Sequence, residues 1–142
     1  MKHRVSKIDA AVHQLDESIK LFLDSKAYVS AITLAGAAEE VIGCATEGNS
    51  MHAKMKEELK NSTGKQGKVI SDEYLNPTKN WLKHWTNMTE EELVEIDLET
   101  ESIHYIFRAM GNLLVYDRSC SSETPRFLAW VLKNRLDLFP DL

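Results

Sequence analysis

The chain has 142 residues, of which 43% are hydrophobic and 27% are charged; this composition is typical of one globular domain and excludes a disordered chain. Its formal net charge of −5 argues against a broad electrostatic surface for nucleic acid, although a local basic site can still exist. No apolar run of signal-peptide length follows the charged N-terminus, and none approaches the about 20 residues of a membrane span. We therefore expect one cytoplasmic domain over residues 1–142 with no membrane segment.

The chain has two cysteines, Cys44 and Cys120, and they do not form a Cys-x-x-Cys pair. A chain of this length buries enough surface to fold without a disulfide or a metal. We therefore expect two buried or free thiols in a reducing compartment.

Two amphipathic patterns open the chain and predict helices over about residues 6–25 and 27–46. In the first, one apolar stripe has the spacing of a helix face: Ile8, Val12, Leu15, Ile19 and Phe22. Ser6 is placed to cap the N-terminus of this helix. The second helix carries small residues that let a neighbouring backbone come close: Ala31, Ala35, Gly36 and Ala38.

The next segment is more polar and is interrupted by glycine. Residues 50–60 predict a short polar helix. Residues 61–71 contain two glycines and predict a mobile loop. Residues 87–97 are acidic and predict a segment that is partly loop.

The pair Asn76-Pro77 predicts the start of a short helix, because asparagine is a good cap and proline favours the first helical position. We expect this helix to run to about Thr86. Its Trp81 and Trp85 are four residues apart, so both are expected to face the core.

Two longer helices are predicted to end the chain, over residues 98–117 and from Thr124-Pro125 onward. The first is expected to bury Ile103, Ile106, Phe107, Met110, Leu113 and Leu114. The second has an apolar side made of Phe127, Leu128, Val131, Leu132 and Leu136. No segment alternates with the period of two that a strand requires. We therefore predict an all-α protein, an antiparallel bundle of four to five helices.

Residues 79–84 carry the densest candidate chemistry in the chain. On a helix, Asn80 and His84 share one face, and Lys79 and Lys83 share an adjacent face. One short helix thus offers an apolar side and a strip of lysine, asparagine and histidine. The same strip is also typical of a solvated helix face with a structural histidine.

A second polar line follows the long C-terminal helix at steps of four: His104, Arg108 and Asn112. It borders the predicted buried face. Arg108 could pair with Glu39 or Glu40, since a carboxylate among small packed residues needs a partner. Such a pair is more often an interhelical salt bridge than a catalytic device.

Metal and hydrolase chemistry find little support. Glu101 and His104 form one Glu-x-x-His motif, but di-iron bundles use two such motifs together with two further glutamates. The chain has no Gly-x-Ser-x-Gly elbow, and Cys44 has no base beside it in sequence. We therefore expect no metal and no cofactor.

Three segments together resemble the HEPN superfamily of small helical bundles. They are residues 30–40 (SAITLAGAAEE), residues 79–84 (KNWLKH) and residues 108–112 (RAMGN). The resemblance extends over about residues 8–117. It implies a four- or five-helix domain that forms a homodimer, and many superfamily members are metal-independent ribonucleases.

The superfamily motif is an arginine, an adjacent polar residue and a histidine a few positions later. The resemblance therefore assigns Lys79 to the arginine position, Asn80 to the polar position and His84 to the histidine position. A histidine of near-neutral pKa can move the proton of a ribose 2′-hydroxyl, and a cation can stabilise charge on the phosphate. Such a reaction would leave a 2′,3′-cyclic phosphate.

Lys79 departs from the superfamily pattern. Lysine keeps the charge of arginine but lacks its flat, two-pronged donor. Other superfamily members are non-catalytic partners of nucleotidyltransferases, or binding modules in defence and toxin–antitoxin systems. Three interpretations follow: a non-catalytic or weakly active binding component, a metal-independent endoribonuclease that binds RNA, and a plain interaction bundle.

The expected homodimer has a second motivation besides the superfamily. The predicted helix pair carries four aromatic residues, which is more than one small helix can readily cover: Trp81, Trp85, Tyr105 and Phe107. An aromatic excess of this kind is typical of an interface.

Overall fold

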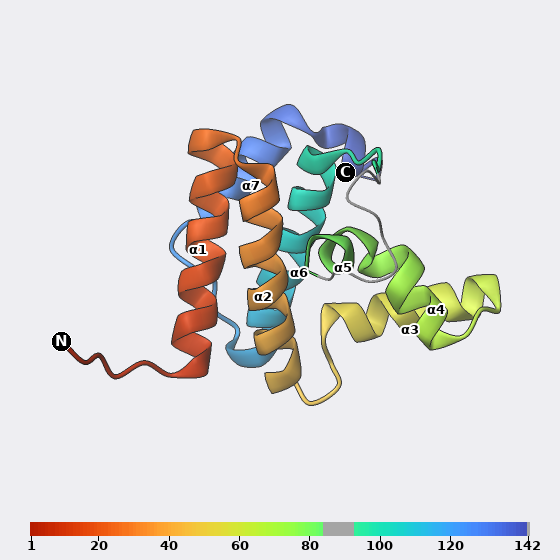
Figure 1. Ribbon diagram of the computed structural model, residues 1–142, viewed down its shortest axis with the longest axis horizontal. Coiled ribbons are helices and arrows are strands. Elements are labelled where there is room, and N and C mark those ends of the chain that lie inside the picture. Colours follow the sequence, from red (N-terminus) through yellow and green to blue (C-terminus); the bar gives the residue numbers. More distant parts are fainter. Residues whose placement is uncertain (84–92, 142) are drawn as a thin grey trace.

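A computed structural model describes residues 1–83 and 93–141 (Figure 1). Within these two ranges every regular element is helical, which confirms the all-α class. The elements are α1 (Lys7–Ser25), α2 (Tyr28–Ala45), α3 (Met51–Thr63), α4 (Gly67–Val69), the π-helical η1 (Ile70–Leu75), α5 (Pro77–Lys83), α6 (Leu98–Asp117), α7 (Thr124–Asn134) and the 3-10 turn η2 (Leu136–Leu138).

Helix α2 packs against both α1 and α6, and α3 and α4 extend to the right of these helices in Figure 1. Helices α1 and α2 form an antiparallel hairpin, in which Ser18 Oγ donates to the Ala31 carbonyl oxygen (2.7 Å). The small residues of α2 allow this packing, since Ala31, Ala35 and Ala38 are fully buried.

Helices α2 and α6 run parallel, so the predicted antiparallel arrangement is wrong for this pair. Near their N-termini, Ser102 Oγ donates to the Tyr28 carbonyl oxygen (3.3 Å). About three turns later, Asn112 Nδ2 donates to the Glu39 carbonyl oxygen (2.9 Å). The physical reason is the long connection, because the segment carrying α3, α4 and α5 returns the chain to the end at which α2 began.

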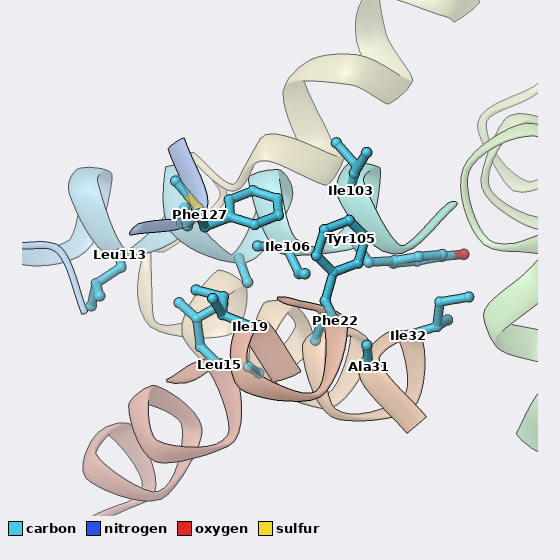
Figure 2. Close-up of a cluster of buried hydrophobic side chains, with 14 of the residues drawn as sticks. Leu15, Ile19, Phe22, Ala31, Ile32, Ile103, Tyr105, Ile106, Leu113 and Phe127 are labelled. Atoms are coloured by element: carbon cyan, nitrogen blue, oxygen red, sulfur yellow. The ribbon is translucent and has the colours of Figure 1, made fainter. Parts of the chain in front are cut away.

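The core is one apolar cluster contributed by α1, α2, α6 and α7 (Figure 2). Figure 2 shows its larger side chains, among them Leu15, Ile19, Phe22, Ile103, Ile106 and Phe127. Phe22 contacts the rings of Tyr28, Phe127 and Trp130 at centroid distances of 5.5, 5.6 and 4.9 Å. These tilted and edge-on contacts fix α7 over the α1–α2 hairpin.

Several predicted boundaries are confirmed. The long C-terminal helix begins at Leu98 and ends at Asp117, and α1 begins one residue after Ser6. Ser6 caps α1 as expected, because its hydroxyl oxygen accepts the backbone N–H of Asp9 (3.0 Å).

The predicted loop over residues 61–71 is wrong for most of its length. Helix α3 continues to Thr63, and helical structure resumes at Gly67. Gly64 has a φ of +70° and donates its N–H to the Lys60 carbonyl oxygen (2.9 Å), so this glycine caps a helix.

Three leucines that were expected to be buried are about half exposed: Leu114, Leu132 and Leu136. Leu114 is on α6 and Leu132 on α7, and Leu136 follows α7 in the turn η2. Both cysteines are free and exposed, so of the two predicted options the free thiol is the one found.

Trp81 is half-buried and lies outside the core, and Leu82 packs against the core in its place. The indole instead lines a surface hollow together with Pro77 and Ile96. Trp85 falls outside the described residues, as do the end of the predicted helix and the start of the acidic segment.

One described helix, α2, is long and apolar enough to cross a membrane on length and composition alone. In the structure its apolar residues pack against α1 and α6. This is the setting of the central helix of a bundle.

Asn112 fastens three helices and gives a test of the parallel arrangement. Its side chain is fully buried, donates to the Glu39 carbonyl oxygen and accepts the Met51 backbone N–H (2.7 Å). We expect Asn112→Ala to lower the free energy of unfolding by about 2 kcal/mol, because two buried backbone groups lose a partner. Urea unfolding measures the free energy of unfolding of this variant. The matched control is Asn61→Ala at an exposed position, whose free energy of unfolding should change by less than about 0.5 kcal/mol. Equal values for the two variants would contradict the bridging role.

Candidate functional site

A polar cleft of about 650 Å³ lies between the C-terminal half of α2, the start of α3, η1 and α5. Its walls include Glu39, Glu40, His52, Asn76, Lys79, Asn80 and Lys83. Most of the candidate site residues from the segment 79–84 and from α2 therefore line the same cleft.

Glu39 lies at the base of the cleft and binds two cations. Its Oε1 is 3.2 Å from Arg108 Nη2, and its Oε2 is 3.8 Å from Lys79 Nζ. All three side chains are nearly inaccessible, with exposed fractions of 4%, 5% and 9% for Glu39, Arg108 and Lys79. The expected pairing of Arg108 with α2 is confirmed, and Glu39 is the partner.

Gly36 explains how Lys79 reaches Glu39 across α2. A Cβ atom at residue 36 would lie 2.7 Å from Lys79 Cδ and 3.1 Å from Lys79 Cγ. A glycine therefore leaves the channel through which the aliphatic part of Lys79 passes. The position of Lys79 is also fixed through its own backbone N–H, which donates to Tyr105 Oη (3.3 Å).

Arg108 also fastens the end of η1. Its Nη1 donates to the Leu75 carbonyl oxygen (2.6 Å) and its Nη2 to Asn76 Oδ1 (2.9 Å). Tyr105 Oη donates to the same Leu75 oxygen (3.1 Å), and burial raises the pKa of Tyr105 to about 12. The tyrosine therefore stays a neutral donor at physiological pH.

His52 belongs to the same network although its sequence context gave no sign of it. Its Nε2 lies 3.2 Å from Asn76 Nδ2 and 3.1 Å from Ser71 Oγ. Because Asn76 Oδ1 accepts from Arg108, the amide group of Asn76 can only donate to the imidazole. Nε2 is therefore the acceptor and the ring proton lies on Nδ1. Burial, together with the Arg108 charge, lowers the pKa of His52.

The structure brings most predicted site residues together. Lys79 Nζ and Lys83 Nζ are each 3.6 Å from Glu40 Oε2, and the half-buried Asn80 lines the cleft beside them. Asn112 is one turn from Arg108 and binds the backbone of Glu39. Together these residues form a mixed-charge surface around a buried ion-pair cluster.

Two predicted residues are not part of this group. His104 is exposed, and its Nδ1 lies 3.9 Å from Glu101 Oε1, one helical turn away. The step of four that linked it to Arg108 does not bring it to the cleft, because α6 turns it outward. His84 lies outside the described residues.

The Glu-x-x-His pair of α6 has a local role. The His104 side chain lowers the pKa of Glu101, so the carboxyl is ionised at neutral pH. Within residues 1–83 and 93–141, no three His, Cys, Asp or Glu side chains converge in a metal-binding arrangement.

Comparison of the chain with protein-family models, with curated proteins and with solved structures found no match. The HEPN resemblance therefore rests on the three sequence segments alone. The chemistry of the cleft follows from its own geometry and charges.

Glu39 and its neighbour Glu40 form a matched pair for testing the ion-pair cluster. Glu39→Gln leaves Arg108 and Lys79 buried without their shared anion, and we expect the free energy of unfolding to fall by about 3 kcal/mol. Glu40 is 59% exposed, so Glu40→Gln is expected to cost less than about 1 kcal/mol. Chemical denaturation of both variants measures the difference. Similar values would show that Glu39 is not the anchor of the cluster.

The network also predicts a pH dependence of stability. The pKa of His52 is lowered in the folded protein from about 6.5, so below that pH the unfolded chain binds a proton that the folded chain excludes. The stability contributed by neutral His52 is complete above about pH 6.5 and is lost as the pH falls toward the lower folded value. Unfolding free energies measured between about pH 7.5 and about pH 5.5 should show this fall.

Two variants assign the effect to this imidazole. His52→Gln keeps an acceptor for Asn76 but cannot titrate, and we expect its stability to vary less over the same pH range. The exposed His13→Gln should follow the wild-type curve. A wild-type slope that persists in His52→Gln would assign the pH dependence to another group.

Proposed function

We propose that this protein is a HEPN-like binding component that does not turn over RNA and that acts on a protein partner, in the manner of defence or toxin–antitoxin systems. The observation that carries the proposal is the state of Lys79, the residue at the superfamily's arginine position. Its side chain is 9% exposed, and its Nζ lies within 4 Å of the carboxylates of Glu39 and Glu40.

A catalytic cation must meet the phosphate oxygens as their charge increases. Lys79 can do this only by leaving Glu39, which would strand a buried carboxylate beside Arg108 alone. Lysine also lacks the forked donor set with which arginine holds a phosphate on two oxygens. Both arguments favour a structural use of Lys79 over catalysis.

The open part of the cleft favours a protein partner. Lys83 is 33% exposed, and its nearest anion Glu40 is 59% exposed. Asp72 adds a further exposed carboxylate to the wall. Such alternating charges pair with the mixed side chains of a protein surface, whereas an RNA backbone requires uniformly positive charge. The net charge of −5 points the same way; a nucleotidyltransferase is the partner class that the resemblance suggests.

The proposed homodimer rests on the superfamily resemblance. Two of the aromatics that motivated it are used within the chain: Tyr105 is 1% exposed, and Phe107 contacts the rings of Phe127 and Phe139. Light scattering over a wide concentration range tests the dimer directly, and a monomer throughout would remove it from the proposal.

The competing function is a metal-independent endoribonuclease that uses Lys79, Asn80 and His84. Its support is the position of Asn80, which lines the cleft next to the lysine. For this function Lys79 would have to exchange Glu39 for a phosphate during turnover. The third interpretation, a plain interaction bundle, needs neither the cleft nor the motif.

Incubation of the purified protein with structured RNAs in the absence of divalent metal tests the proposal. We expect no cleavage at micromolar protein, because the phosphate-binding cation is already neutralised. An established ribonuclease that leaves cyclic phosphates serves as the positive control. The variants His84→Ala and Lys79→Arg are assayed beside the wild type.

Cleavage that leaves 2′,3′-cyclic phosphate and is lost in His84→Ala would overturn the proposal in favour of the endoribonuclease. Activity that appears only in Lys79→Arg would support the proposal of a non-catalytic protein. The natural chain would then lack only the two-pronged donor of an arginine at residue 79. Cleavage that persists in His84→Ala would exclude the mechanism that uses Lys79, Asn80 and His84 as its source.

A further inference from the structure

Helix α3 is attached to the neighbouring segments at its first two residues. Met51 donates its backbone N–H to Asn112 Oδ1 (2.7 Å). His52 contacts Ser71 and Asn76 of the adjoining segment 70–76. None of the 13 residues of α3 is buried against the part of the chain that the structure describes. A polar helix of this length is only marginally stable in isolation, so α3 depends on its attachments to stay helical.

The contact that His52 makes with Ser71 and Asn76 requires a neutral imidazole. Asn76 Nδ2 lies 3.2 Å from His52 Nε2, and Ser71 Oγ lies 3.1 Å from it. A proton on Nε2 would set one N–H group against another, because Asn76 Nδ2 can only donate. Asn76 cannot turn its amide over to accept this proton, since its Oδ1 is held by Arg108 Nη2 at 2.9 Å.

The charges around His52 also oppose its protonation on balance. They come from α2, α3, η1, α5 and α6: Glu39 and Glu40, Lys56, Asp72, Lys79 and Arg108. Burial and the charges of Arg108, Lys56 and Lys79 lower the pKa of His52, and Glu39 raises it without offsetting them. Protonation is therefore favoured in an arrangement in which the imidazole meets water instead of Asn76.

The His52 contact lies where two walls of the polar cleft meet. Ser50 and His52 line the cleft from the start of α3, whereas Asp72 and Asn76 line it from the segment 70–76. The hydrogen bond between His52 and Asn76 joins these two walls. Loss of this bond would therefore separate α3 from η1 and widen the cleft at this end.

We infer that His52 is a proton-sensitive switch that holds α3 against η1 when it is neutral, and that releases α3 and opens the polar cleft when it is protonated. This opening is local, because α1, α2 and α6 remain folded while α3 loses its attachment. The inference is independent of the binding function proposed for the cleft, since its test needs neither RNA nor a partner protein.

Hydrogen exchange of the full chain, corrected for the intrinsic exchange rate at each pH, provides the test. We expect the amides of α3 to exchange through a lower opening free energy than those of α2, as local opening requires. Their protection factor should fall by up to about tenfold between about pH 7.5 and about pH 5.5, because released His52 regains an ordinary pKa near 6.5.

Three variants identify the group and the polarity of its contact. His52→Gln keeps an acceptor for Asn76 but cannot titrate, so the protection of α3 should no longer depend on pH in this way. In Asn76→Asp a carboxylate can accept from both Arg108 and protonated His52, so α3 should be better protected at the lower pH. The exposed His13→Gln should follow the wild type. Circular dichroism confirms that each variant is folded.

Four results would overturn the inference. The first is an unchanged protection factor of α3 in the wild type at the lower pH. The second is exchange of the α3 amides at the same opening free energy as those of α2, because α3 would then be released only by global unfolding. The others are a fall that persists in His52→Gln and a fall of wild-type size in Asn76→Asp. If the aspartate variant does not fold, the wild type and His52→Gln still decide the outcome.

Discussion

The buried carboxylate of Glu39 is the interaction on which the other features of this protein depend. It lies on α2 and binds Arg108 of α6 and Lys79 of α5, so one anion joins three helices. Removing three charged side chains from water costs several kcal/mol for each ion, and hydrogen bonds must offset this cost. Arg108 supplies them through the Leu75 carbonyl oxygen and the Asn76 amide. The end of η1 and the beginning of α5 therefore have their positions because Glu39 requires partners.

This arrangement gives a physical account of the lysine in the motif. A lysine has one compact charge on a flexible stem, and that stem can follow the channel over Gly36 to reach a carboxylate from the side. The planar guanidinium of an arginine is wider than an ammonium group, and a second such group would compete with Arg108 for the same anion. Lys79 is therefore better suited to a structural ion pair than to binding a phosphate group.

Sequence periodicity predicted the elements whose burial comes from their own helix face. The bounds of α1 and α6 follow from their apolar stripes and end residues, and the pairing of Arg108 with α2 follows from the need of a buried carboxylate for a cation. The relative direction of the helices was missed. The direction of α6 relative to α2 is decided by the connection between them, and nothing in either helix encodes it.

The candidate site likewise contains residues that the sequence predicted and residues that it did not. Residues four apart on one helix were expected to act together. Arg108 instead pairs with the buried Glu39, whereas the exposed His104 lies near Glu101, one turn away on its own helix. His52 enters the site from α3 through Asn76 and Ser71, two contacts across 24 and 19 residues of sequence. Contacts between residues this far apart produce no periodic pattern in the sequence. The resemblance to a known superfamily drew attention to residues 79–84, but the partners of the Lys79 charge, Glu39 and Glu40, are visible only in the structure.

The parallel pairing of α2 and α6 has a consequence for how this chain folds. The contacts that join the two helices link residues 73 and 74 positions apart in sequence. The α1–α2 hairpin, by contrast, closes a connection of two residues. Since loop closure costs more entropy for longer loops, we expect the hairpin to form first and α6 to dock later. In that order of events Glu39 would stay accessible to water until α6 brings Arg108, and the polar cleft would be among the last parts of the native structure to be completed.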